Sequence, residues 1–126
     1  MTGYTGNIEE LTLQNANFRQ VLYTPSHMQL VLMSLKPLED LGLEIHETID
    51  QFFRIEKGQG KIVMNGEETE LKDGSAIVVP AGTEHNLINT SETEDLKLYT
   101  IYSPPNHPAD RVQLTREQAM AEEDHH

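Results

Sequence analysis

The chain has 126 residues, of which 21 are acidic and 9 basic, giving a formal net charge of −12, and it contains no cysteine. This length is typical of a single folded domain with a substantial core. The absence of cysteine excludes disulfides, thiolate nucleophiles and cysteine-ligated metal centres. The negative charge argues against binding to nucleic acid or to an anionic membrane surface.

The N-terminal residues show no feature of an export signal. Residues 1–15 contain neither a basic patch nor the apolar segment of a signal peptide. No apolar stretch in the sequence approaches the about 20 residues that a membrane-spanning helix needs. We therefore expect a cytoplasmic protein with no membrane partner.

Short strand-like runs separated by turn residues recur along the chain. Residues 17–24 and 28–35 are rich in β-branched, aromatic and leucine side chains, and residues 43–49 alternate between apolar and polar side chains. Asn65-Gly66 is a strong signal for a two-residue hairpin turn. The pattern predicts an all-β sandwich or barrel.

The composition changes after Pro104-Pro105. Residues 105–126 contain helix-forming side chains with little periodicity, which predicts a short C-terminal helix or a tail outside the barrel. We expect one domain over residues 1–126, with its barrel core at about residues 17–103.

One stretch has a spacing that points to a family. Residues 74–89 read glycine, five residues, proline, one residue, glycine, two residues, histidine, three residues and asparagine; the residues are Gly74, Pro80, Gly82, His85 and Asn89. This is similar to the second conserved motif of the cupin superfamily, G-x5-P-x-G-x2-H-x3-N. In that motif the bend before the histidine directs its side chain into the barrel, so the resemblance implies that His85 is a metal ligand.

A second stretch resembles the first cupin motif in an altered form. In residues 42–60, Glu44, His46 and Gln51 fall where the family usually has two histidines and a glutamate. The pattern is therefore E-x-H-x4-Q in place of H-x-H-x4-E. The resemblance covers about residues 28–103 and implies a double-stranded β-helix, or jelly-roll barrel.

The resemblance also implies a metal centre. Glu44 and His46 are two residues apart, so on a strand their side chains leave the same face, and in a small barrel alternate residues point inward. With the register of the family, Glu44, His46, Gln51 and His85 converge. Two imidazoles, a carboxylate and an amide oxygen suit Mn, Fe, Zn, Ni or Co. Gln51 is the weakest ligand of the four, and its alternative role is to hydrogen-bond a metal-bound water.

Three functions are compatible with such a site. The first is a metal-dependent isomerase or epimerase of a small sugar or sugar acid, in which the metal polarises a carbonyl and Glu44, when it is not bound to the metal, is the general base. The chain resembles short cupins of the mannose-6-phosphate isomerase type, but it lacks an evident cluster of Lys and Arg for a phosphate. The alternatives are an Fe(II) dioxygenase and a non-catalytic cupin that binds a small ligand or a metal.

The sequence also suggests a homodimer. Cupins commonly dimerise, and residues 28–35 are apolar at both alternating sets of positions, so the face outside the barrel needs a cover. Either a second subunit or the chain's own tail could provide that cover, and we favour the homodimer.

Overall fold

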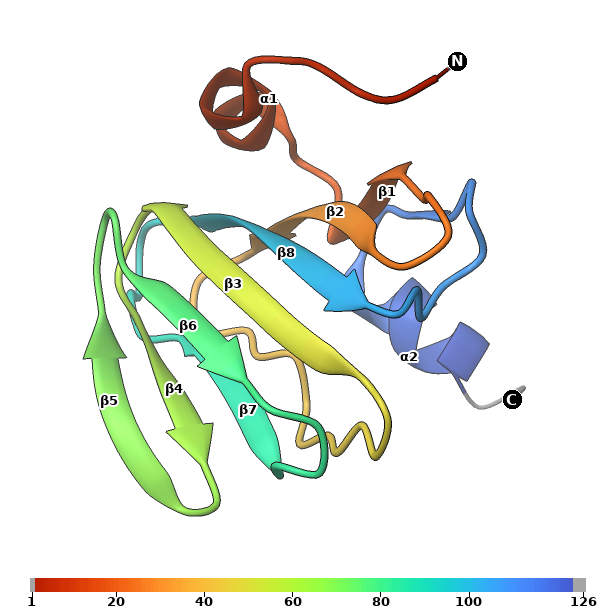
Figure 1. The fold of residues 1–126 in the computed structure, drawn as a ribbon. Helices are drawn as coiled ribbons and strands as arrows, with labels where there is room; N and C mark the ends of the chain where they lie inside the picture. The colour runs from red at the N-terminus through yellow and green to blue at the C-terminus, as the bar shows by residue number, and fades with distance from the viewer. Residues whose placement is uncertain (1, 124–126) are drawn as a thin grey trace.

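The computed structural model describes residues 2–123 and is built around two antiparallel β-sheets (Figure 1). The larger sheet has six strands in the order β6-β3-β8-β2-β1-β9, and the smaller has three in the order β5-β4-β7. The strands are β1 (Arg19–Tyr23), β2 (Gln29–Leu35), β3 (Asp50–Lys57), β4 (Gly60–Met64), β5 (Glu67–Leu71), β6 (Ala76–Val79), β7 (His85–Asn89), β8 (Leu96–Ser103) and β9 (Val112–Gln113). Two short helices, α1 (Ile8–Gln14) and α2 (Arg116–Glu123), complete the fold.

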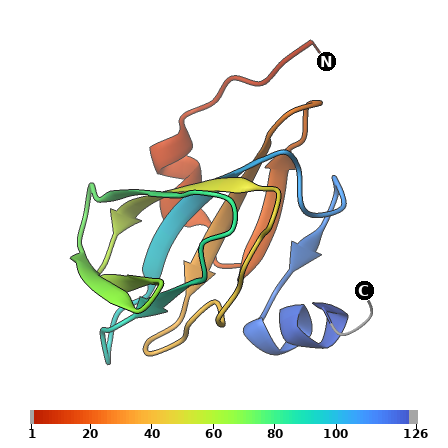
Figure 2. The same ribbon diagram turned by 60° about the horizontal axis from the view of Figure 1, so that its bottom comes forward.

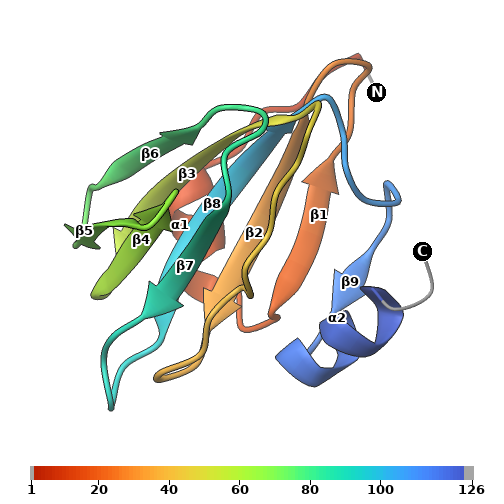
Figure 3. The same cartoon turned by 90° about the horizontal axis from the view of Figure 1, so that it is seen from below.

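The two sheets form facing layers. Seen from below, β7 of the smaller sheet lies in front of β8 and β2 of the larger sheet (Figure 3). Helix α1 lies on the outer face of the larger sheet, and α2 lies beside β9 (Figures 1 and 2). The all-β prediction and the short C-terminal helix are confirmed; residues 124–126 of the predicted tail lie outside the described residues.

The inward-facing side chains of the larger sheet form rows across β2, β8 and β3. Alternation along each strand places every second residue inside. Three successive rows are Gln29, Tyr102 and Gln51; then Val31, Thr100 and Phe53; then Met33, Leu98 and Ile55. All nine residues are buried. The interior therefore changes from a polar end to a fully apolar end, and chemistry is restricted to the polar end.

The turn at Asn65-Gly66 forms as the sequence predicts. Both residues have positive φ, 49° and 83°, which is the conformation of the tightest hairpin turns. Met64 pairs with Glu67 across this turn. The hairpin fixes the register of β4 and β5, and β4 in turn pairs with β7, which begins at His85.

The strand expected at residues 43–49 is absent, so this prediction is wrong. Residues 36–49 run beside the edge strand β7 of the smaller sheet as an irregular segment, and their backbone pairs with β7 only through single bridges, Asp40 with Ile88 and Glu44 with His85. Positive φ values at Leu38 (65°) and Gly42 (92°) break any continuous ladder before Glu44. The apolar side chains that suggested the strand, Leu43 and Ile45, are 64% and 48% exposed.

Helix α1, which was not predicted from the sequence, covers part of the larger sheet. The side chain of Asn7 accepts a hydrogen bond from the backbone N–H of Glu10 and caps the helix, and Glu9 and Glu10 lie in the first turn, where the helix dipole favours negative charge. Helix α1 packs against β2, β3 and β8. Leu32, which faces outward on β2, is only 3% exposed. The chain itself therefore provides part of the cover that residues 28–35 require.

No helix within residues 2–123 is long and apolar enough to span a membrane.

Candidate functional site

His85 lies at the polar end of the barrel, at the first residue of β7. The preceding bend is held by Gly82, whose φ is +84° and whose N–H donates to the carbonyl oxygen of His46 at 2.8 Å. The His85 side chain is buried, and its Nδ1 lies 2.9 Å from the carbonyl oxygen of Thr83. Because a carbonyl oxygen only accepts, Nδ1 donates to it, and Nε2 is the ring nitrogen not used in this contact. The contact to Thr83 thus leaves Nε2 as the atom of His85 that could bind a metal.

Glu44 and His46 reach the same place without the strand that was expected to carry them. The backbone of Glu44 exchanges two hydrogen bonds with that of His85, at 2.9 and 2.8 Å. The carboxylate Oε2 of Glu44 lies 3.2 Å from Nε2 of His46, and the rings of His46 and His85 have centroids 5.6 Å apart. The Glu44 and His46 side chains are only 22% and 15% exposed, so the pair lies at the rim of the buried interior.

Gln51 points into the barrel from β3 and is 3% exposed. Its amide Nε2 donates to Oγ1 of Thr100 at 3.0 Å, and the Thr100 hydroxyl donates to the carbonyl oxygen of Phe52 at 2.8 Å. Because the Thr100 hydrogen is used in the second bond, its oxygen must accept the first, and this fixes the orientation of the amide. The amide oxygen Oε1 is buried and has no hydrogen-bond partner in the described structure.

Tyr102 lies beside Gln51 in the same inward row at the polar end. It was not among the site residues predicted from the sequence. Burial raises the pKa of its hydroxyl to about 12, with a further increase from the charge of Glu44; the charge of Arg19 and hydrogen bonds from Arg19 and Gln51 act in the opposite direction. The hydroxyl also lies 3.3 Å from Nε2 of His107. Tyr102 therefore stays neutral, as a proton donor, across the physiological range. Its place in the same inward row as Gln51 was the available signal.

The raised pKa of Tyr102 makes stability depend on pH in the alkaline range. In the unfolded chain the hydroxyl ionises near 10, whereas in the folded protein it ionises near 12. This group therefore leaves stability unaffected below about pH 10 and lowers it as the pH rises from 10 to 12, by up to about 3 kcal/mol. We expect Tyr102→Phe to remove this part of the decline in the free energy of unfolding, measured by denaturant unfolding between pH 9 and 12. Tyr99→Phe, on the outer face, serves as the control. If the free energy of unfolding depended on pH equally in the wild type and both variants, the assignment would be contradicted.

The expected ligands do not form a complete metal centre in this structure. Within residues 2–123, no three His, Cys, Asp or Glu side chains are grouped so that they could hold a metal ion. The structure brings Glu44, His46 and His85 together at one end of the barrel, with Gln51 in the adjoining inward row. The donor types remain those that suit a divalent transition metal. In the present arrangement, however, His46 is paired with Glu44.

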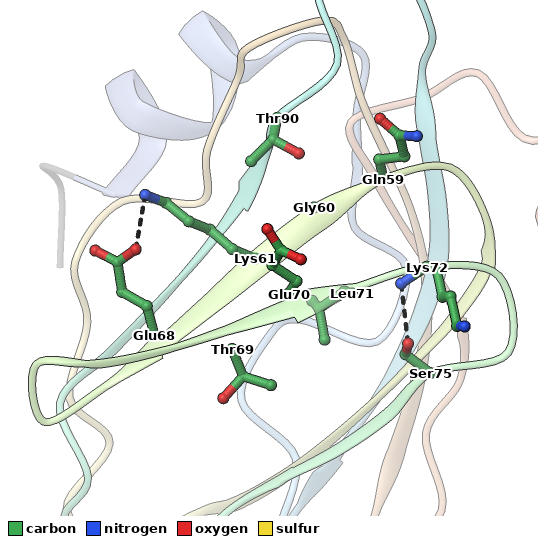
Figure 4. A pocket seen from close by; sticks show the side chains of 10 residues that line it. All are labelled: Gln59, Gly60, Lys61, Glu68, Thr69, Glu70, Leu71, Lys72, Ser75 and Thr90. Carbon is green, nitrogen blue, oxygen red and sulfur yellow. Dashed lines mark hydrogen bonds and ion pairs between the residues drawn. The ribbon is translucent and has the colours of Figure 1, made fainter.

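Two pockets lie on the outer surface, away from the histidines. One, of about 860 Å³, lies beside the β4–β5 hairpin and is lined by charged and polar side chains, including the ion pair of Lys61 with Glu68 at 3.1 Å (Figure 4). The other adjoins it and shares Gln59 and Lys72 with it. Neither contains His46 or His85. Because the first pocket is bordered by carboxylates as well as ammonium groups, it has no single charge preference.

The fold and motif positions agree with a known family model. Residues 31–102, more than half of the chain, match the model described as "Cupin domain". The chain belongs to the cupin domain family. This cupin is 52% identical to the uncharacterized protein YrkC of Bacillus subtilis, over 94% of its own length and 66% of the length of YrkC. The chain thus spans slightly less than two thirds of that relative.

Solved structures agree with this assignment. The crystal structure of BH2720 from Bacillus halodurans has 45% sequence identity and a TM-score of 0.91, covering 94% of this chain and 93% of that chain. A "predicted oxalate decarboxylase" from Thermotoga maritima has 26% identity and a TM-score of 0.59, covering 64% of this chain and 69% of that chain. The resemblance to a small cupin that the two motifs suggest is confirmed.

Proposed function

We propose that this cupin is a metal-dependent enzyme of the isomerase or epimerase type, acting on a small sugar or sugar acid. The observation that carries the proposal is the unpartnered amide oxygen of Gln51, which is buried at the end of the barrel that also holds His46 and His85. A buried oxygen without a partner costs about 1–3 kcal/mol, and it becomes satisfied when a cation or a hydrogen-bond donor reaches it. A ligand that enters this end of the barrel could therefore satisfy the Gln51 oxygen.

The residues that would hold the metal are His46, His85 and Gln51, with Glu44 as a fourth ligand only in the alternative in which it is not the base. Their donor set fits Mn, Fe, Zn, Ni or Co. His85 contacts Thr83 through Nδ1, so this contact does not involve Nε2. Binding would replace the present contact of His46 with Glu44. A bound divalent ion supplies a Lewis acid that polarises a substrate carbonyl.

The protein's own side chains supply the proton transfers. The Glu44 carboxylate contacts His46, and as general base it would take a proton from the carbon next to the carbonyl. The neutral hydroxyl of Tyr102 would donate a hydrogen bond to a substrate oxygen. Gln51 and Thr100, held by their mutual hydrogen bond, limit the movement of the site.

The test is proton exchange on a panel of sugars and sugar acids. Protein loaded separately with Mn, Fe or Zn is incubated with each compound in deuterium oxide, and NMR follows deuterium at the carbon next to the carbonyl. We expect exchange on at least one compound, and its loss in the His46→Ala/His85→Ala variant. Iron-dependent oxygen consumption without exchange would favour the dioxygenase alternative. Binding with no reaction would leave a non-catalytic cupin.

We also propose that the protein forms a homodimer through the outer face of the larger sheet. One row across this face consists of Val78, Phe52, Ile101 and Leu30, which pair in register and are all partly or largely exposed. A continuous apolar row of this kind is costly in water, and a second copy could cover it.

Val78→Glu should therefore dissociate the dimer. Val78 is 64% exposed, so in a monomer the substitution costs little, whereas in a dimer it buries a carboxylate. Leu114→Glu, at a residue 61% exposed and outside this sheet face, is the matched control. Light scattering coupled to size exclusion should give a dimer for the wild type and control and a monomer for Val78→Glu. A monomeric wild type, or a dimeric Val78→Glu, would contradict the proposed interface.

A further inference from the structure

The inner side of β1 carries a buried arginine that has no role in the proposed proton transfers. Arg19 is 4% exposed. Its Nη1 donates to the amide oxygen of Gln113 at 2.5 Å, and its Nε is buried without a hydrogen-bond partner. None of the ion pairs found within residues 2–123 includes Arg19. The other three arginines, Arg54, Arg111 and Arg116, each pair with a carboxylate.

Burying a guanidinium is expensive unless an anion compensates the charge. Desolvation of an ionised side chain costs several kcal/mol, and a neutral amide such as that of Gln113 offsets only part of it. A guanidinium presents its donors in a planar fork that matches the two oxygens of a carboxylate. The missing partner of Arg19 is therefore best supplied by a ligand that carries a carboxylate.

The backbone of Arg19 pairs with Met33, in the apolar row, and its side chain extends from there toward Tyr102 at the polar end. The side chains of Arg19 and Gln51 both lower the pKa of the Tyr102 hydroxyl, which places the guanidinium close to the row that contains Gln51. The ring of Tyr102 lies edge-on to that of His46, with centroids 6.1 Å apart. Two side chains near the Tyr102 hydroxyl each have a buried polar atom without a hydrogen-bond partner. These atoms are the donor Nε of Arg19 and the acceptor Oε1 of Gln51.

We propose that Arg19, with the hydroxyl of Tyr102, binds the carboxylate of the substrate, so that the enzyme acts on sugar acids or similar hydroxy acids and discriminates against neutral sugars. This inference rests on the proposed function and specifies its substrate class. The carboxylate takes hydrogen bonds from the guanidinium and from the neutral hydroxyl. The remainder of the molecule then extends toward Glu44 and the histidines, where the reacting carbon would lie.

The test compares acids with their neutral counterparts by isothermal titration calorimetry. The pairs are D-gluconate with D-sorbitol, D-galacturonate with D-galactose, and D-glycerate with glycerol. The wild type should bind the acid of at least one pair at least about 10-fold more tightly than its neutral partner. Arg19→Gln should weaken binding of that acid about 10- to 100-fold, as expected when a charged hydrogen-bonding partner is lost. It should leave binding of the neutral compound unchanged.

Two further variants separate recognition from folding. Arg54→Gln makes the same substitution on the outer face of the same sheet, where Arg54 pairs with Glu56 at 3.4 Å, and it should keep the full preference for the acid. Arg19→Lys keeps the charge but loses the fork, and should retain part of the preference. Should Arg19→Gln fail to fold, the wild-type comparison and Arg19→Lys still decide the question.

Equal binding of acid and neutral compound by the wild type, no binding of any acid, or an unchanged preference in folded Arg19→Gln would overturn the inference. These outcomes are separable from failure of the proposed function. An Arg19-dependent preference for acids in a protein that binds no metal would contradict only the metal-dependent mechanism. Metal-dependent proton exchange on neutral sugars, without preference for acids, would contradict only the role of Arg19.

Discussion

Glu44→Gln is expected to lower the rate of substrate proton exchange about 100- to 10,000-fold, the range typical for loss of a general base. Glutamine preserves the size of the side chain and can still contact Nε2 of His46, so the structure should persist. The carboxylate side chain is 22% exposed and makes one contact of 3.2 Å, so the free energy of unfolding should change by less than about 1 kcal/mol. The NMR exchange assay and denaturant unfolding measure the two effects separately.

Glu47→Gln is the matched control for this prediction. Glu47 lies three residues further along the same segment and is exposed, so the variant should keep the wild-type rate. The metal content of Glu44→Gln then identifies the role of the carboxylate: a retained metal with lost exchange indicates a base, and a lost metal indicates a ligand. An exchange rate equal to that of the wild type would contradict both roles.

Asn89→Ala should destabilise the protein by about 3–5 kcal/mol. Asn89 is fully buried, and its Nδ2 donates to the carbonyl oxygens of Leu35, Lys36 and Glu94 at 2.9–3.1 Å, while its Oδ1 accepts from the N–H of Ser91. The alanine variant leaves these backbone groups unsatisfied and also creates a cavity. The last residue of the cupin motif therefore contributes to stability, because it joins the ends of β2 and β7 to the loop before β8.

Asn86→Ala, in the same strand, provides the comparison. Its Nδ2 makes one hydrogen bond, to Oδ2 of Asp40, in a partly buried position, so a loss of about 1 kcal/mol is expected. Urea unfolding of the two variants and the wild type gives both values. A loss for Asn89→Ala no larger than that for Asn86→Ala would contradict the structural role assigned to Asn89.

The sequence predicts the sheets and the position of His85 well, because both depend on local signals. Alternating apolar residues define the buried faces of β3 and β8, and Asn65-Gly66 determines its hairpin without help from distant residues. The spacing from Gly74 to Asn89 describes one continuous bend and strand. Such features are readable from a short window of residues.

The predictions that failed depended on contacts between distant segments. The alternation of residues 43–49 suggested a strand, but the strained backbone at Leu38 and Gly42 and the lack of a continuous partner leave only a single bridge at Glu44. Arg19 and Tyr102 come from opposite ends of the chain, and no local pattern indicates that they meet. Helix α1 was missed because its seven residues carry only a weak periodic signal.

The central claim is that the polar end of the barrel binds a transition metal, and metal content tests it most directly. Plasma mass spectrometry is applied to protein purified without a histidine tag, beside the His46→Ala/His85→Ala variant, after reconstitution of both with Mn, Fe, Zn, Ni or Co and removal of free ions. We predict about one equivalent of metal in the wild type and its loss in the variant. A wild type that retains no metal after reconstitution, or a variant that retains as much as the wild type, would contradict the claim.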